Sequence, residues 1–177
     1  MKKILGLMLT VASVSYSFAG NTYIDGNIGV FNPPTSFYSA SVGLNANIGY
    51  MFNPYFGLEG GLTYSPLNVA ENTSAVNVTS DYFGLDVAVK GLLPLSRSFG
   101  LYGKLGLSEN WYNSTVSVGG LSASASGDST GGLVGVGAQF NLTRNWSMHL
   151  ENDYTFLFSP DGISNPNLAM LGVEYKF

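Results

Sequence analysis

The chain has 177 residues, enough for one domain, and only 10% of them are charged, against ~25% in ordinary globular domains. Its formal net charge of −4 offers no basic footprint for nucleic acid. The absence of cysteine from the sequence excludes disulfides, thiolate catalysis and thiolate metal sites.

The first 19 residues have the layout of a secretory signal peptide. Lys2 and Lys3 give a charged start, residues 4–14 form an apolar run, and residues 17–19 place small side chains where a signal peptidase cleaves. A membrane-spanning helix needs ~20 apolar residues, and serines interrupt this run too early. We therefore predict a signal peptide over residues 1–19 and a single exported domain over residues 20–177.

The exported part alternates apolar and polar residues with a period of two, which is typical of strands. None of its stretches is long and apolar enough for a membrane helix, whereas segments of about ten residues suit strands that cross a bilayer at a tilt. In chain order, the predicted strands cover residues 22–31, 41–51, 55–64, 81–93, 99–111, 131–142, 145–158 and 168–177.

The two faces of these segments indicate a membrane rather than a water-soluble sheet. The apolar face carries aliphatic residues in the middle and aromatic residues at the ends, which is the girdle pattern of a lipid-facing wall. The other face is half glycine and has few charges, whereas the solvent face of a soluble sheet would be rich in Lys and Glu. Because lipid cannot satisfy free backbone groups, the sheet must close. We predict an all-β fold, an eight-stranded antiparallel up-and-down transmembrane β-barrel.

The connections predict the orientation. Three are tight (residues 52–54, 94–98 and 143–145) and alternate with four longer ones (32–40, 65–80, 112–130 and 159–166). Short turns of such barrels face the periplasm and long loops face outward. The predicted inner girdle is Tyr50, Phe56, Phe99, Phe140, Trp146, Tyr175 and Phe177, and the outer one is Tyr64, Phe83, Trp111, Tyr154 and Phe156.

The long connections carry no Lys or Arg, which disfavours binding of heparin or DNA. We expect plain solvated loops there. The alternative is that residues 76–79 and 115–118, which keep a period of two, extend the strands and leave an edge for strand addition by a partner.

Two polar residues, Glu109 and Asn152, fall on the lipid face by strict alternation. Either they lie in the headgroup layer, where the cost of polarity fades, or a β-bulge shifts the register beside them.

Charged residues of the opposite face are predicted to fill the lumen. An eight-stranded barrel has an interior just wide enough for its own side chains, and an isolated buried charge is costly. We predict a salt-bridged plug that blocks a continuous pore, with a proton or ion path as the alternative. Its members are Asp25, Glu59, Asp86, Lys90, Lys104, Glu151, Asp153, Glu174 and Lys176.

His149 forms a row with Ser147 and Glu151 on one strand face, which raises the possibility of hydrolase chemistry. Residues two apart on a strand lie ~6.5–7 Å apart, too far for a nucleophile–base hydrogen bond. The glycines between residues 131 and 137 lack the helix and lysine of a phosphate loop. We predict no enzyme activity, no cofactor and no metal site.

Several segments resemble those of OmpA-type barrels. Residues 53–59, Asn-Pro-Tyr-Phe-Gly-Leu-Glu, resemble the first periplasmic turn and third strand of that family. Residues 101–106 are similar to its fifth strand, and the ending Leu-Gly-Val-Glu-Tyr-Lys-Phe at residues 171–177 is similar to its closing strand. The resemblance implies an eight-stranded barrel inserted by the barrel-assembly machinery, which would read Tyr175 and Phe177 as an assembly signal.

The sequence differs from full-length OmpA in having no peptidoglycan-binding domain after the barrel, so cell-wall anchoring is not expected. The nearer comparison is with barrel-only surface proteins such as opacity-type antigens. The expected function is that of a small structural or surface-exposed protein in the bacterial outer membrane, surrounded by lipid and lipopolysaccharide. An adhesin or host-factor-binding antigen is the first alternative, and a lipid A-modifying enzyme or narrow pore is the second.

Overall fold

The computed structural model describes residues 21–33, 38–69, 76–118, 121–158 and 165–177. Strands make up nearly all of this part of the chain, and none of its segments is a helix long and apolar enough to span a membrane. The strands are β1 (Thr22–Asn32), β2 (Tyr38–Ser39), β3 (Ser41–Met51), β4 (Phe56–Val69), β5 (Val76–Pro94), β6 (Phe99–Val118), β7 (Leu121–Asn141), β8 (Trp146–Leu157) and β9 (Asn167–Lys176). The predicted signal peptide lies outside the described residues.

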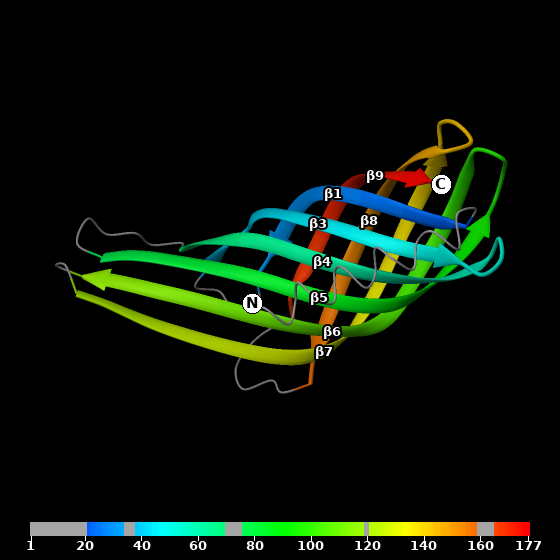
Figure 1. Ribbon diagram of the computed structural model, residues 1–177. Helices are drawn as coiled ribbons and strands as arrows, with labels where there is room; N and C mark the ends of the chain where they lie inside the picture. The colour runs from blue at the N-terminus through cyan, green and yellow to red at the C-terminus, as the bar shows by residue number, and fades with distance from the viewer. Residues whose placement is uncertain (1–20, 34–37, 70–75, 119–120, 159–164) are drawn as a thin grey trace.

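Eight of these strands close into an antiparallel barrel (Figure 1). Each long strand pairs with the next along the chain, and β9 returns to pair with β1, with Tyr23 opposite Lys176. The ninth element, β2, is a two-residue addition to the outer end of β4. The predicted eight-stranded up-and-down barrel is therefore confirmed.

The strands are staggered by ten residues around the barrel. Following paired residues from Thr22 on β1 through each strand in turn leads back to β1 at Asn32; the intermediate partners are Tyr50, Leu58, Val89, Leu105, Val134, Tyr154 and Asn167. A stagger of ten residues rises ~33 Å while eight strands span ~38 Å, so the strands tilt by ~40° from the barrel axis. This tilt lets strands of about ten residues cross the bilayer.

The strand register is continuous at Glu109 and Asn152, the two polar residues predicted on the lipid face. Glu109 pairs with Leu85 and Thr130, and Asn152 pairs with Val136 and Ala169, without an inserted residue in the described ladders. The bulge alternative is therefore wrong. Glu109 instead accepts a hydrogen bond from the Thr130 hydroxyl at 2.7 Å, and Asn152 accepts one from the Asn167 amide at 3.2 Å.

The outer wall is apolar and the interior is polar. Leu105 and Leu150 are 67% and 61% exposed, whereas Glu59 and His149 are 1% and 2% exposed. In water this arrangement would leave much unfavourable apolar surface uncovered, so the wall requires lipid. Predicted girdle residues touch on neighbouring strands at both rims; the ring centroids are 4.8 Å apart for Phe99–Phe140, 4.9 Å for Trp146–Tyr175 and 5.6 Å for Phe83–Trp111.

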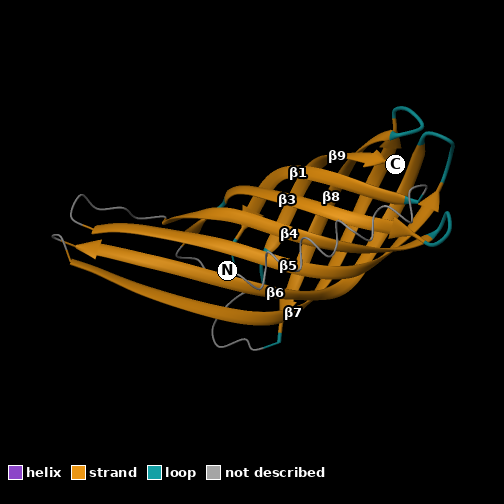
Figure 2. Ribbon diagram, viewed as in Figure 1, coloured by secondary structure: helices purple, strands orange, loops and turns teal. Residues whose placement is uncertain are grey.

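The structure corrects the prediction of plain loops at residues 65–80 and 112–130. β4 continues to Val69, and β6 and β7 remain paired up to Val118 and Leu121. Alternating Val, Thr and Ser suit a pleated sheet, and pairing satisfies backbone groups that a loop would leave to water. As a result β5, β6 and β7 project well beyond the barrel wall, at the end opposite the short turns (Figure 2).

Candidate functional site: the barrel lumen and the projecting sheet

The centre of the lumen is occupied by Glu59, on the inner face of β4. Its carboxylate accepts hydrogen bonds from Lys90 at 3.2 Å, from Lys104 at 3.0 Å and from the Tyr23 hydroxyl at 2.6 Å. Glu59, Lys90 and Lys104 are all at most 3% exposed. Such buried charges are tolerated only when they are paired and hydrogen-bonded, and here one carboxylate bridges two ammonium groups.

The two lysines extend this network to the opposite wall. Lys104 also binds Glu151 and, at 3.1 Å, Asp153, both on β8. Lys90 reaches Glu174 on β9 at 3.4 Å. Charged side chains from five strands, β4, β5, β6, β8 and β9, are thus joined across the interior.

Two tyrosines flank the Lys90 ammonium group. Its nitrogen lies 4.5 Å from the ring centre of Tyr23 and 4.6 Å from that of Tyr102, within the range of a cation–π interaction. The Tyr102 hydroxyl donates to Glu151. Composition and charge alone do not predict that these two tyrosines belong to the lumen network. The alternation of the strands was the available signal, because it places both side chains on the inner face.

A second group in the lumen consists of amides around Asp25. The side-chain amides of Asn27 and Asn47 donate to Asp25 Oδ1 at 2.6 and 2.8 Å. Asn27 Oδ1 lies 2.6 Å from His149 Nε2. Asp25 is therefore held by hydrogen bonds rather than by an ion pair.

Asp86 and Lys176 are less closely integrated. Asp86 is buried and makes no hydrogen bond or ion pair with the described residues; it lines a cavity of about 20 Å³ together with Asp153, room for about one water molecule. Lys176 has a side chain 35% exposed at the mouth and pairs with Glu174 at 3.3 Å. The structure thus links seven of the nine predicted lumen residues by ion pairs, with Asp25 and Asp86 outside that linkage.

The row of Ser147, His149 and Glu151 points into the lumen, but its members bind other partners. The Ser147 hydroxyl donates to Asn141 at 2.9 Å, His149 meets Asn27, and Glu151 binds Lys104 and Tyr102. The described contacts include no hydrogen bond between two members of the row. The arrangement does not form a nucleophile–base pair.

Glycines on the inner face make room for these side chains. A Cβ added at Gly172 would collide with Asn27 Oδ1 and His149 Nε2. Gly172 lies on β9 between Asn27 on β1 and His149 on β8, so these two residues can hydrogen-bond over β9 only because this position has no side chain.

Known proteins share this architecture. The sequence matches the family described as outer membrane protein beta-barrel domain over residues 4–177. The chain belongs to this family of outer-membrane barrels. It is 28% identical over 169 residues to outer membrane protein A of Serratia marcescens, in a match covering 90% of this chain but 45% of that protein. The chain thus spans about half the length of this curated relative.

Solved outer-membrane barrels show the same fold. Neisserial surface protein A superposes with a TM-score of 0.67 at 16% identity, covering 88% of this chain and 97% of that one. Ail, the attachment invasion locus protein of Yersinia pestis, superposes with a TM-score of 0.61 at 22% identity, covering 89% and 97%. The outer membrane enzyme PagL, at 9% identity and a TM-score of 0.54 over 88% and 99% of the two chains, has the fold as well. The family match places this protein in the outer membrane, and the shared fold does not decide its activity.

The last strand of this barrel protein ends at the rim with two aromatic residues, Tyr175 and Phe177. The Phe177 amide donates to the Thr22 carbonyl at 3.1 Å, and Phe177 is 54% exposed. Its ring lies 5.2 Å from that of Tyr175. Both aromatic residues lie at the rim with the short turns, and their role as an assembly signal stays a prediction.

Proposed function

We propose that this protein is a closed membrane anchor that holds the sheet formed by β5, β6 and β7 outside the cell as a contact surface for a partner. The observation that carries this proposal is the length of β7. β8 pairs with β7 only from Gly131 onward, so residues 121–129 of β7 have no strand partner on that side among the described residues. A free strand edge is a template for strand addition.

The side chains along this edge favour access. The edge has the sequence Leu-Ser-Ala-Ser-Ala-Ser-Gly-Asp-Ser over residues 121–129, and residues 122–128 are exposed. It contains neither lysine nor proline, the residues that commonly guard exposed edges. Small side chains leave room for an incoming strand, and backbone hydrogen bonds would supply its affinity.

The chemistry of the partner differs from the ligand seen in one relative. Ail has been solved in complex with the heparin analogue sucrose octasulfate. Here the described residues outside the lumen at the projecting end include the acids Asp81, Glu109 and Asp128 but no base. We therefore propose a protein or peptide partner rather than a sulfated polyanion.

A shortened hairpin tests the proposal. Residues 114–125 are replaced by Asn-Gly, a two-residue hairpin turn, so that the paired residues Asn113 and Ser126 flank the new turn. Adhesion of bacteria carrying either form to cultured epithelial cells is then measured. We expect adhesion to fall to the level of cells without the protein. The shortened barrel should still fold, which is checked by a change in its gel mobility when the sample is heated. Equal adhesion by both forms would overturn the proposal.

We also propose that the lumen is closed to ions and performs no catalysis. The ion pairs from Glu59 to Lys90 and Lys104 occupy its middle, and the His149 row lacks a nucleophile–base pair. Planar-bilayer recording should find no steady conductance, and replacing His149 by Ala should leave the lipid A profile of the host cell unchanged. Outer-membrane lipid and lipopolysaccharide would contact the apolar wall, and the barrel-assembly machinery would bind the closing strand.

A further inference from the structure

The exposed Lys and Arg side chains of the described residues gather at one place. The sequence has seven basic residues; two precede the described residues, and Lys90 and Lys104 are buried in the lumen. The other three line one open groove of about 410 Å³ at the end with the short turns: Arg97, Arg144 and Lys176. Within the part of the chain that the structure describes, all exposed Lys and Arg side chains are therefore on the periplasmic rim.

The groove is built from three chain segments that are hydrogen-bonded to one another. The turn after β5 is joined to the end of β7, because the Asn141 backbone amide donates to the Ser98 carbonyl at 2.9 Å and the Asn141 side chain to the Arg97 carbonyl at 3.2 Å. The Asn145 side chain donates to the Lys176 carbonyl at 2.8 Å. These bonds fix the backbones that carry the three cations relative to one another.

Two of the cations lack a counter-charge. Lys176 binds Glu174, but Arg97 and Arg144 are exposed and form no ion pair with the described residues. The residues lining the groove include no acid. The charges of the two arginines are therefore not balanced by an acid in the groove and would attract an anion.

The aromatic girdle fixes the depth of the groove in the membrane. Aromatic side chains of outer-membrane barrels lie at the level of the lipid headgroups. Each cation is one or two residues from such a side chain: Arg97 from Phe99, Arg144 from Trp146, and Lys176 from Phe177. The groove thus opens at the level of the phosphates of the periplasmic leaflet.

We propose that this groove binds the phosphate of an anionic phospholipid of the periplasmic leaflet, namely phosphatidylglycerol. Guanidinium groups fit phosphate oxygens in a two-pronged geometry, and two unpaired guanidinium groups line the groove. Leu142, which is exposed and lines it as well, offers an apolar contact for the glycerol and upper acyl chain. Bound lipid would hold this rim at a fixed depth in the bilayer.

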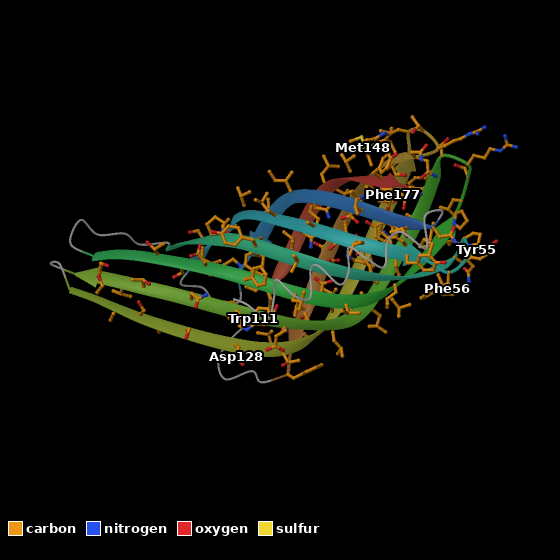
Figure 3. The ribbon with its side chains drawn as sticks, viewed as in Figure 1. Tyr55, Phe56, Trp111, Asp128, Met148 and Phe177 are labelled. Carbon is orange, nitrogen blue, oxygen red and sulfur yellow. The ribbon has the colours of Figure 1, made fainter. Side chains whose placement is uncertain are left out.

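The two tryptophans of the sequence allow a direct test. Trp146 is two residues from Arg144 of the groove, whereas Trp111 lies toward the opposite end of the barrel from Phe177 (Figure 3). The Trp111→Phe variant is refolded into phosphatidylcholine vesicles containing brominated phosphatidylglycerol or brominated phosphatidylcholine, and quenching of Trp146 is compared. We expect roughly three- to tenfold preferential binding of phosphatidylglycerol near Trp146 at low salt, weakened by high salt. The Arg97→Gln/Arg144→Gln double substitution should abolish the preference.

The reciprocal Trp146→Phe variant, with Trp111 reporting, is the matched control and should show no preference. Salt dependence in the arginine-containing Trp111→Phe variant provides a second readout should the double variant fold poorly. Equal quenching of Trp146 by both lipids overturns the proposal. Arginine-dependent sedimentation with purified peptidoglycan, without lipid preference, would overturn it in favour of a cell-wall contact.

Discussion

Lys104 on β6 donates to Glu59 on β4 at 3.0 Å although the two residues are 45 positions apart and β5 separates their strands. The contact therefore passes over the inner face of β5 and joins two strands that are not hydrogen-bonded to each other. Both side chains are buried, so removing one of them leaves the other as an unpaired charge in the lumen. The cost of that unpaired charge determines how much each substitution destabilises the protein.

Removing the Lys104 charge should be among the most damaging substitutions in the lumen. Lys104→Met would leave Glu59, Glu151 and Asp153 without their shared cation. Stranding one partner of a buried ion pair costs ~3–5 kcal/mol. We expect a loss of this size in the free energy of unfolding, measured by urea titration of the refolded protein in detergent or lipid.

Lys176→Met is the matched control, because this lysine is at the mouth and partly exposed. Its loss should cost ~0–1 kcal/mol. Similar losses for the two variants would show that the lumen is hydrated well enough to solvate the carboxylates.

Gly172 and Gly26 offer a comparison between the two faces of the wall. Gly172→Ala would force apart Asn27 and His149, whereas a Cβ at Gly26 meets nothing within 4 Å. We expect ~1–3 kcal/mol of destabilisation at Gly172 and little change at Gly26, measured by the same unfolding titration. A neutral Gly172→Ala variant would contradict the close packing described for the lumen.

The lipid face can be tested by depth. Leu105 lies midway along β6 between Phe99 and Trp111, whereas Leu95 is in the short turn before that strand. Leu105→Arg should cost ~2–4 kcal/mol and Leu95→Arg ~0–1 kcal/mol. Refolding into lipid vesicles measures both values, and equal costs would mean that the membrane does not cover the wall at Leu105.

Phe177 is expected to matter more for assembly than for stability. Phe177→Ser and Phe140→Ser both remove an exposed girdle aromatic, 54% and 50% exposed respectively, so their stabilities after refolding should be alike. In cells, Phe177→Ser alone should reduce the amount of folded protein in the outer-membrane fraction, as judged by the heat-dependent gel shift. Parallel behaviour of the two variants in cells would argue against an assembly signal at the terminal residue.

The membrane-crossing part of the fold was predictable because alternation there has a strong physical basis. On β8, for example, lipid selects Leu150 for one face and the lumen selects His149 and Glu151 for the other. The continuous alternation also places Glu109 and Asn152 correctly on the outer face.

Beyond the bilayer this signal weakens. On β6 and β7 small polar residues replace the aliphatic ones on the outer face, as with Thr115 and Ser124, so the strands resemble loop sequence although they remain paired. The interior partners were predictable as a set but not as pairs. The contact of Lys104 with Asp153, for example, passes over Gly135 on β7, and the stagger of the strands determines which inward residues come level in this way.

The ten-residue offset between Thr22 and Asn32 has a consequence for misfolding. A hairpin could be misplaced only in steps of two residues, because a single step would turn its apolar side chains inward. Each such step would also change the girth of the barrel, since offset and diameter are linked. The bulky interior residues Tyr23 and Tyr102 therefore favour one barrel diameter. A narrower barrel could not contain them, and a wider one would separate their hydroxyls from Glu59 and Glu151.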